Sequence, residues 1–245
     1  MNKNIRILQF LVSILYSVQS HFSSAQTIQL NGNGIPESIT RSITGVDGNA
    51  ALNISVPYKT SYTQNILSVE SSINIKGGTS NTSIGGAGVY GENFTLNNNG
   101  SVWGGDGYNG GVAVSGNEIL IRNLYGGNGL GGSGSSGGAG LSGDDIIVDN
   151  YRSIYGGDDV GGTGGSGVTG SNITVHNSGG ILGGNGVNGG DGINGSNLFI
   201  TNDNMISGGY GIKQGGDAIS GNQITLNNNG IVQGGYGPDG GCSVY

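Results

Sequence analysis

A long internal repeat constrains this sequence more than any other feature. The segment SGNQITLNNNGIVQGGYG at residues 220–237 follows the pattern of YGENFTLNNNGSVWGGDG at residues 90–107, and the letters TLNNNG are identical in both. A glycine opens each copy at intervals of 25 to 27 residues: Gly91, Gly116, Gly143, Gly170, Gly195 and Gly221. Repeats of this length are typical of solenoids, in which each copy stacks on the next one.

Three apolar signals recur in every copy. The first is a pair of bulky residues two positions apart, which places both side chains on one face of a strand. The pairs are Phe94/Leu96, Ile119/Ile121, Ile146/Val148, Ile173/Val175, Leu198/Ile200 and Ile224/Leu226. The second signal lies two positions before Gly-Gly: Val102, Leu124, Ile154, Ile181, Ile206 and Val232. The third lies two positions before the next opening glycine: Val89, Val114, Leu141, Val168, Ile193 and Ile219.

Three inward-facing stripes separated by Asn- and Gly-rich corners predict an all-β fold, a parallel β-helix with coils of about 25–27 residues. The general rule for parallel crossovers makes a right-handed coil the default. Residues 91–245 carry the regular copies, and residues 26–90 are expected to form an N-terminal cap and irregular coils. The second copy contains the stretch GGNGLGGSGSSGGAG at residues 126–140, which predicts a longer outer loop there.

Composition agrees with an ordered, exported chain. Glycine accounts for 56 of 245 residues, yet apolar residues keep a regular schedule, which flexible linkers do not. Residues 1–25 have the basic start, apolar centre and small final residues of a signal peptide. Without that segment, 6 Lys and Arg face 15 Asp and Glu, which disfavours nucleic acid as a partner. Cys242 is the lone cysteine, so no disulfide framework is expected.

The signal peptide and the repeat G-x-N-[FIL]-T-[LV]-x-N-x-G-x-[IV]-x-G-G resemble the Gly/Asn-rich passenger domains of Gram-negative autotransporters and related adhesins. The resemblance covers roughly residues 65–245. It implies a β-helix displayed at the outer membrane or secreted, with a role in cell adhesion or self-association. The barrel domain that carries such passengers outward has no counterpart in this sequence, so retention in the periplasm is the corresponding alternative.

Several motifs with chemical potential have simpler structural explanations. Two G-x-G-x-x-G segments, beginning at Gly105 and Gly184, lack the following helix that a dinucleotide site needs. Polar residues that follow Gly-Gly pairs form a column that we consider as a calcium site. The column has oxygen ligands, but its spacing differs from that of calcium-binding repeats. They are Asp106, Asn128, Asp158, Asp159 and Asn185. We therefore expect no metal and no cofactor.

Paired carboxylates are the groups that a polysaccharide-cleaving β-helix would need. The candidates are Asp144-Asp145, Asp158-Asp159 and the segment Thr201 to Asp203, and His176 is the sole histidine outside the signal peptide. Alternation along a strand points the two members of each Asp pair in different directions. We therefore expect no enzymatic activity.

One outward-facing stripe suggests binding. Trp103, Tyr125 and Tyr155 each stand between a second-signal residue and Gly-Gly, where alternation directs side chains outward. Exposed aromatic residues mark interaction surfaces, although stacked rings that shield a sheet are the simpler explanation. Host or bacterial surface glycans or proteins are the partners that this stripe suggests.

The sequence therefore favours a surface-associated or secreted structural and adhesive protein, with a truncated remnant as one possibility. A polysaccharide lyase or hydrolase is the alternative, which a groove with convergent carboxylates would favour. An ice-binding solenoid is disfavoured because Leu120, Ile147 and Phe199 interrupt the threonine column of Thr95, Thr174 and Thr225. The last residues end at a coil boundary, and an open strand edge there suggests self-association.

Overall fold

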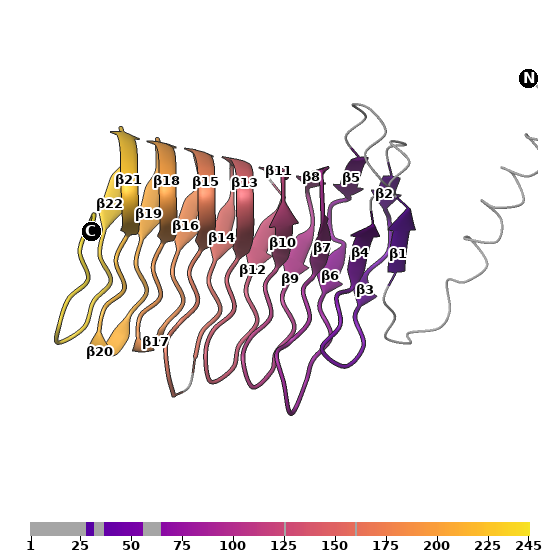
Figure 1. The fold of residues 1–245 in the computed structure, drawn as a ribbon, viewed down its shortest axis with the longest axis horizontal. Helices are drawn as coiled ribbons and strands as arrows, with labels where there is room; N and C mark the ends of the chain where they lie inside the picture. Colours follow the sequence, from indigo (N-terminus) through magenta and orange to yellow (C-terminus); the bar gives the residue numbers. More distant parts are fainter. Residues whose placement is uncertain (1–27, 32–36, 56–64, 125, 160) are drawn as a thin grey trace, which may run out of the picture.

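The computed structural model describes residues 28–31, 37–55, 65–124, 126–159 and 161–245. None of these residues lies in a helix, so this part of the chain has no helix that could cross a membrane. The strands stack coil upon coil along one axis, from the indigo N-terminal end to the yellow C-terminal end (Figure 1). Strand pairings within the described coils are parallel throughout, and the fold is a parallel β-helix, as the repeat predicts.

The largest sheet has 12 strands. They are β1 (Ile28–Asn31), β2 (Glu37–Ile39), β4 (Leu52–Ser55), β5 (Asn65–Val69), β7 (Val89–Glu92), β8 (Phe94–Asn98), β10 (Val114–Asn117), β11 (Leu120–Asn123), β13 (Leu141–Asn150), β15 (Val168–Asn177), β18 (Ile193–Asn202) and β21 (Ile219–Asn228). In the later coils one long strand replaces two shorter ones, since β10 and β11 both pair with β13. The two halves of this sheet form two walls of the coil.

The remaining wall of the coil is a second sheet, which has eight strands. A separate small sheet has two strands. The eight are β3 (Ile43–Thr44), β6 (Asn74–Lys76), β9 (Ser101–Trp103), β12 (Asn128–Leu130), β14 (Ser153–Tyr155), β16 (Gly180–Leu182), β19 (Met205–Ser207) and β22 (Ile231–Gln233). The remaining two are β17 (Gly186–Asn188) and β20 (Gly211–Gln214), which lie at the lower edge of the coils (Figure 1).

Columns of apolar side chains fill the interior. The third-signal residues are in register from Val89 to Ile219 and are at most 2% exposed. The paired residues of the first signal are also buried, from Phe94 to Ile200. Ile224 and Leu226, in the last described coil, are half-buried because no further coil covers them. Stacking of like residues buries faces that an isolated coil would expose.

The opening glycines are a steric requirement. Gly170 has φ of +143°, and a β-carbon placed on it would lie 1.7 Å from the carbonyl oxygen of Gly143 in the preceding coil. No side chain fits at that distance. Two positions later, Asn172 and its counterparts adopt φ near +53°, in the left-handed region that asparagine tolerates best among residues with side chains. This left-handed residue turns the chain from one wall into the next.

An asparagine ladder holds the next corner. It consists of Asn98, Asn123, Asn150, Asn177, Asn202 and Asn228, and each Nδ2 donates to the Oδ1 of the next member at 2.7–2.9 Å. The first five side chains are at most 2% exposed. The preceding coil has Val69 at this position, and the buried Asn98 Oδ1 accordingly has no hydrogen-bond partner among the described residues.

The register corrects the prediction for the second copy. Gly129 and Leu130 lie opposite Val102 and Trp103, so Leu124 is not the inward residue of that coil. The two extra residues of this copy lie between Asn123 and β12, not in the outer loop, whose length matches that of the first copy. Continuous pairing of β12 with β9 and with β14 decides the alignment.

Candidate functional site

In β9, β12, β14 and β16 of the eight-stranded sheet the last residue points outward, because the residue before it points into the core. Val102 is fully buried, whereas Trp103 is 39% exposed. The register stacks Trp103, Leu130, Tyr155 and Leu182, which we call the aromatic column. Lys76 precedes Trp103 in the same register.

A Gly-Gly pair follows the aromatic column in every coil and bends the chain sharply. A β-carbon on Gly105 would lie 2.1 Å from the carbonyl oxygen of Gly78. A second Gly-Gly pair folds back against the first, so that Gly111 N donates to Gly105 O at 2.8 Å and Gly132 N donates to Gly111 O at 2.7 Å. This zigzag of backbone hydrogen bonds continues from coil to coil. The bend is therefore bare backbone, and no side chain rises from it.

A polar column begins directly after the first Gly-Gly pair: Asp106, Ser133, Asp158, Asn185 and Tyr210. Three of its side chains accept from backbone N–H groups of the following coil. Asp106 Oδ1 accepts from Ser133 N at 3.0 Å, Asp158 Oδ1 from Asn185 N at 2.7 Å, and Asn185 Oδ1 from Tyr210 N at 3.0 Å. Carboxylates that accept backbone N–H bonds are held in one orientation.

The aromatic and polar columns are the two sides of a groove, and the Gly-Gly pairs are its floor. Its volume is about 520 Å³, and it extends from Lys76 at one end to Tyr210 at the other. Six successive coils contribute to it, from the coil of β6 to the coil of β19. At a strand spacing of about 4.8 Å, five coil steps make the groove about 24 Å long. An extended ligand can therefore lie along the helix axis.

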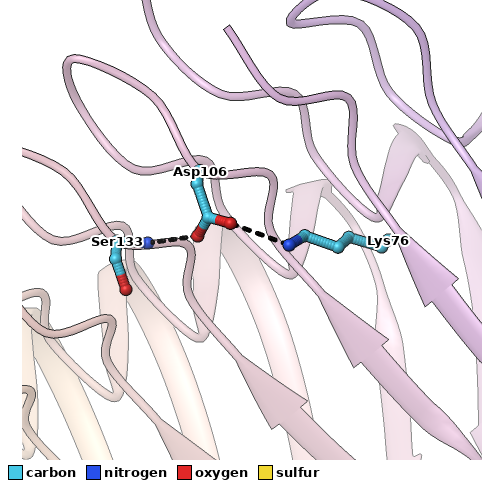
Figure 2. A network of polar contacts seen from close by, with 3 residues as sticks. All are labelled: Lys76, Asp106 and Ser133. Carbon is cyan, nitrogen blue, oxygen red and sulfur yellow. Dashed lines mark hydrogen bonds and ion pairs between the residues drawn. The ribbon is translucent and has the colours of Figure 1, made fainter. Parts of the chain in front are cut away.

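Lys76 closes one end of the groove through an ion pair. Its Nζ lies 2.7 Å from Asp106 Oδ2, while Ser133 N donates to Asp106 Oδ1 (Figure 2). Partial burial raises the pKa of the Asp106 carboxyl, but the Lys76 and Ser133 hydrogen bonds, together with the Lys76 charge, outweigh it and hold the pKa below its ordinary value. Asp106 is thus ionised at neutral pH, and each of its two oxygens accepts one hydrogen bond within the protein.

The groove contains two of the three residues singled out in the sequence. Trp103 and Tyr155 line it. Tyr125 lies outside the described residues, and the register gives its expected place to Leu130. In the polar column, Ser133 stands where we expected Asn128, which instead belongs to β12. Asp159 bridges to Gly134 one position further on and also lies outside this column.

Sequence reasoning missed that the two columns face one groove. It also missed Lys76, Leu182 and Tyr210 as lining residues. The letters INIKGG around Lys76 contain the second signal followed by an outward residue and Gly-Gly, so the same alternation rule identifies that position.

A cluster of titratable residues lies outside the groove. His176 Nδ1 lies 2.9 Å from Asp149 Oδ1, and Arg122 Nε lies 3.7 Å from Asp149 Oδ2, on the outer face of the 12-stranded sheet. Burial raises the pKa of Asp191, although hydrogen bonds from Asn194 and from the Asp217 amide oppose the rise. Within the described residues, no three His, Cys, Asp or Glu side chains are close enough to hold a metal ion.

No protein-family model matches the chain, and comparisons with curated proteins and with solved structures gave no match. The fold and the groove therefore carry the functional argument.

Proposed function

We propose that this β-helix is a binding scaffold that holds an extended glycan chain in the groove between the aromatic and polar columns. The observation that carries the proposal is the pairing of Trp103 and Tyr155 on one side with Asp106 and Asp158 on the other. Sugars present apolar ring faces and hydroxyl edges, so a site for them combines aromatic surface with fixed hydrogen-bond acceptors.

A glycan suits this groove better than a peptide strand. Backbone groups along the floor are already used within the helix: Gly104 N donates to Leu130 O, Gly131 N to Tyr155 O, and Gly156 N to Leu182 O, at 2.8–3.1 Å. A peptide that adds to a sheet edge needs free backbone donors and acceptors. Here the side chains are the groups that remain available for recognition.

Binding without cleavage is the favoured activity. A glycosidase needs a protonated carboxylic acid of raised pKa beside a second carboxylate. Asp106 has a lowered pKa, an ion pair with Lys76 and a backbone N–H on its other oxygen. The Asp158 carboxylate likewise accepts from Asn185 N. Both groups are arranged as fixed hydrogen-bond acceptors, which supports a non-catalytic role.

Display outside the cytoplasm completes the proposal. The signal-peptide pattern and the resemblance to autotransporter passengers support export, with the β-helix at the cell surface or secreted. Stacked coils offer the same outer surface repeatedly, and repetition strengthens weak adhesive contacts through multivalency.

Binding of purified residues 26–245 to a glycan array, followed by calorimetry on the best ligands, tests the proposal. We expect binding that is lost in the double variant Trp103→Ala/Tyr155→Ala and retained in Tyr108→Ala, an exposed ring outside the groove. If Tyr108→Ala abolishes binding and the groove variant does not, the groove is not the site. If the polysaccharide is shortened, with new reducing or unsaturated ends, the protein is an enzyme and the proposal is wrong.

A further inference from the structure

The groove changes its chemistry in every second coil. Going along the axis, Trp103 faces Asp106, Leu130 faces Ser133, Tyr155 faces Asp158, and Leu182 faces Asn185. A coil with an aromatic ring and a carboxylate therefore alternates with a coil that has leucine and a neutral polar side chain. This two-coil period occurs twice within the groove.

The spacing of that period follows from the register. Neighbouring coils are one strand spacing apart, so the Trp103 and Tyr155 positions are about 9.5 Å apart along the axis. The Asp106 and Asp158 positions have the same separation because they also belong to alternate coils. A ligand that matches the groove must itself repeat after two units, at close to twice the strand spacing.

We infer that the ligand is a β-1,4-linked glycan without charged groups, lying parallel to the helix axis with one sugar per coil. The inference rests on the proposed glycan-binding function. In such a chain each sugar is turned over relative to the one before, and the disaccharide repeat is slightly longer than twice the strand spacing. Every second sugar then meets a ring and a carboxylate in the same orientation.

The absence of charge on the ligand follows from the electrostatics of the groove. Asp106 and Asp158 line it, and Lys76 already pairs with Asp106. The chain beyond the signal segment carries 6 Lys and Arg against 15 Asp and Glu. A polyanionic glycan would be repelled by this surface, whereas hydroxyl groups donate readily to carboxylates.

Calorimetric titration of residues 26–245 with β-1,4-linked gluco- or manno-oligosaccharides of two to six sugars tests the inference. We expect affinity to rise up to the tetrasaccharide, which fills the two periods, and then to level off. An α-1,4-linked glucan, a β-1,3-linked glucan and polygalacturonate serve as comparison ligands, and we expect each to bind at least about tenfold more weakly, the equivalent of one lost aromatic contact.

A matched pair of variants tests the spacing itself. Leu130→Tyr/Tyr155→Leu keeps the composition of the aromatic column but moves the second ring to the coil beside Trp103. We expect this double variant to lose about tenfold in tetrasaccharide affinity, while Leu130→Tyr alone, which retains Tyr155, binds as the parent does. Circular dichroism checks that both variants remain folded.

The outcomes separate the two levels of the proposal. If the comparison glycans bind as well as the β-1,4-linked ones, or if the double variant binds normally, the two-coil match is wrong while glycan binding stands. If polygalacturonate binds best, the preference for uncharged chains is wrong. If no glycan binds, or if a peptide binds instead, both the inference and the proposed function fail.

Discussion

Replacing Asn177 by alanine interrupts the asparagine ladder at a fully buried position. Asn177 Nδ2 donates to Asn202 Oδ1 at 2.7 Å and to Met205 O at 3.0 Å, and its Oδ1 accepts from Asn150 Nδ2 at 2.8 Å. In the variant, the buried Asn202 Oδ1 loses its donor, while Asn150 Nδ2 keeps the Gly180 carbonyl at 3.1 Å. The Gly179 N–H, which donates to Asn177 Oδ1 at 3.3 Å, also loses its acceptor, so the loss falls on this corner and on the coil that follows.

The expected loss in the free energy of unfolding is about 3 kcal/mol. A buried acceptor left without a partner costs about 1–3 kcal/mol, and each further lost hydrogen bond about 0.5–1.5 kcal/mol. Asn228→Ala is the matched control, because Asn228 ends the ladder and is exposed. Water can replace its contacts, so we expect a loss below about 1 kcal/mol.

Urea unfolding followed by circular dichroism measures both variants. Solenoids unfold coil by coil more readily than globular domains, so hydrogen exchange of the amides between Asn150 and Met205 provides the local measurement. A double-mutant cycle that combines Asn177→Ala with Asn202→Ala identifies the cause of the lost stability. If the orphaned Oδ1 is responsible, removing Asn202 as well must cost less than the sum of the single losses. Equal losses for Asn177→Ala and Asn228→Ala would refute the reasoning.

Two further predictions concern the opening glycines and the ion pair. Gly170→Ala should abolish the cooperative β-sheet signal in circular dichroism, because the new β-carbon would meet Gly143 O. Gly161→Ala is the control, because a β-carbon there has no atom within 4 Å, and it should change the free energy of unfolding by less than about 0.5 kcal/mol. Equal behaviour of the two would remove the steric argument. Lys76→Met should raise the pKa of Asp106, measured by NMR titration. Because the folded pKa lies below the unfolded one, the pair stabilises the fold at neutral pH, and this stability is lost as pH falls through the folded pKa. The parent and the variant should then differ at pH 7 and converge in strong acid; an unchanged Asp106 pKa would contradict the assignment.

Much of the fold was predictable because every copy of the repeat has the same kinds of residue at equivalent positions. Bulky residues at alternate positions marked the inward faces, and the structure confirms the columns headed by Val89 and Phe94. The interruption of the threonine column by Leu120, Ile147 and Phe199 is also confirmed.

The second copy was misaligned because it offers the same signal twice. Leu124 and Gly129 each stand two positions before a Gly-Gly pair, and Leu124 is the apolar one. Side-chain hydrophobicity alone favours Leu124 as the inward residue. Strand pairing with the coils on both sides instead places Gly129 there. Hydrogen bonds to two neighbouring coils outweigh the burial of one leucine side chain, because a shifted strand would lose its pairing above and below.

The sequence by itself determined the coil: its length, its inward columns, the glycines where no β-carbon fits and the asparagines at the corner. These features depend on the periodicity of the sequence and on local steric contacts, and both can be read from the sequence alone. Only the tertiary structure decided the groove. Trp103 and Asp106 are three residues apart, but whether their columns diverge or face each other depends on how sharply the Gly-Gly pair bends. Two backbone hydrogen bonds fix that bend: Gly111 N donates to Gly105 O within one coil, and Gly132 N donates to Gly111 O from the next coil. The alternation of ring and leucine coils likewise became visible only once the register had placed Leu130 between Trp103 and Tyr155.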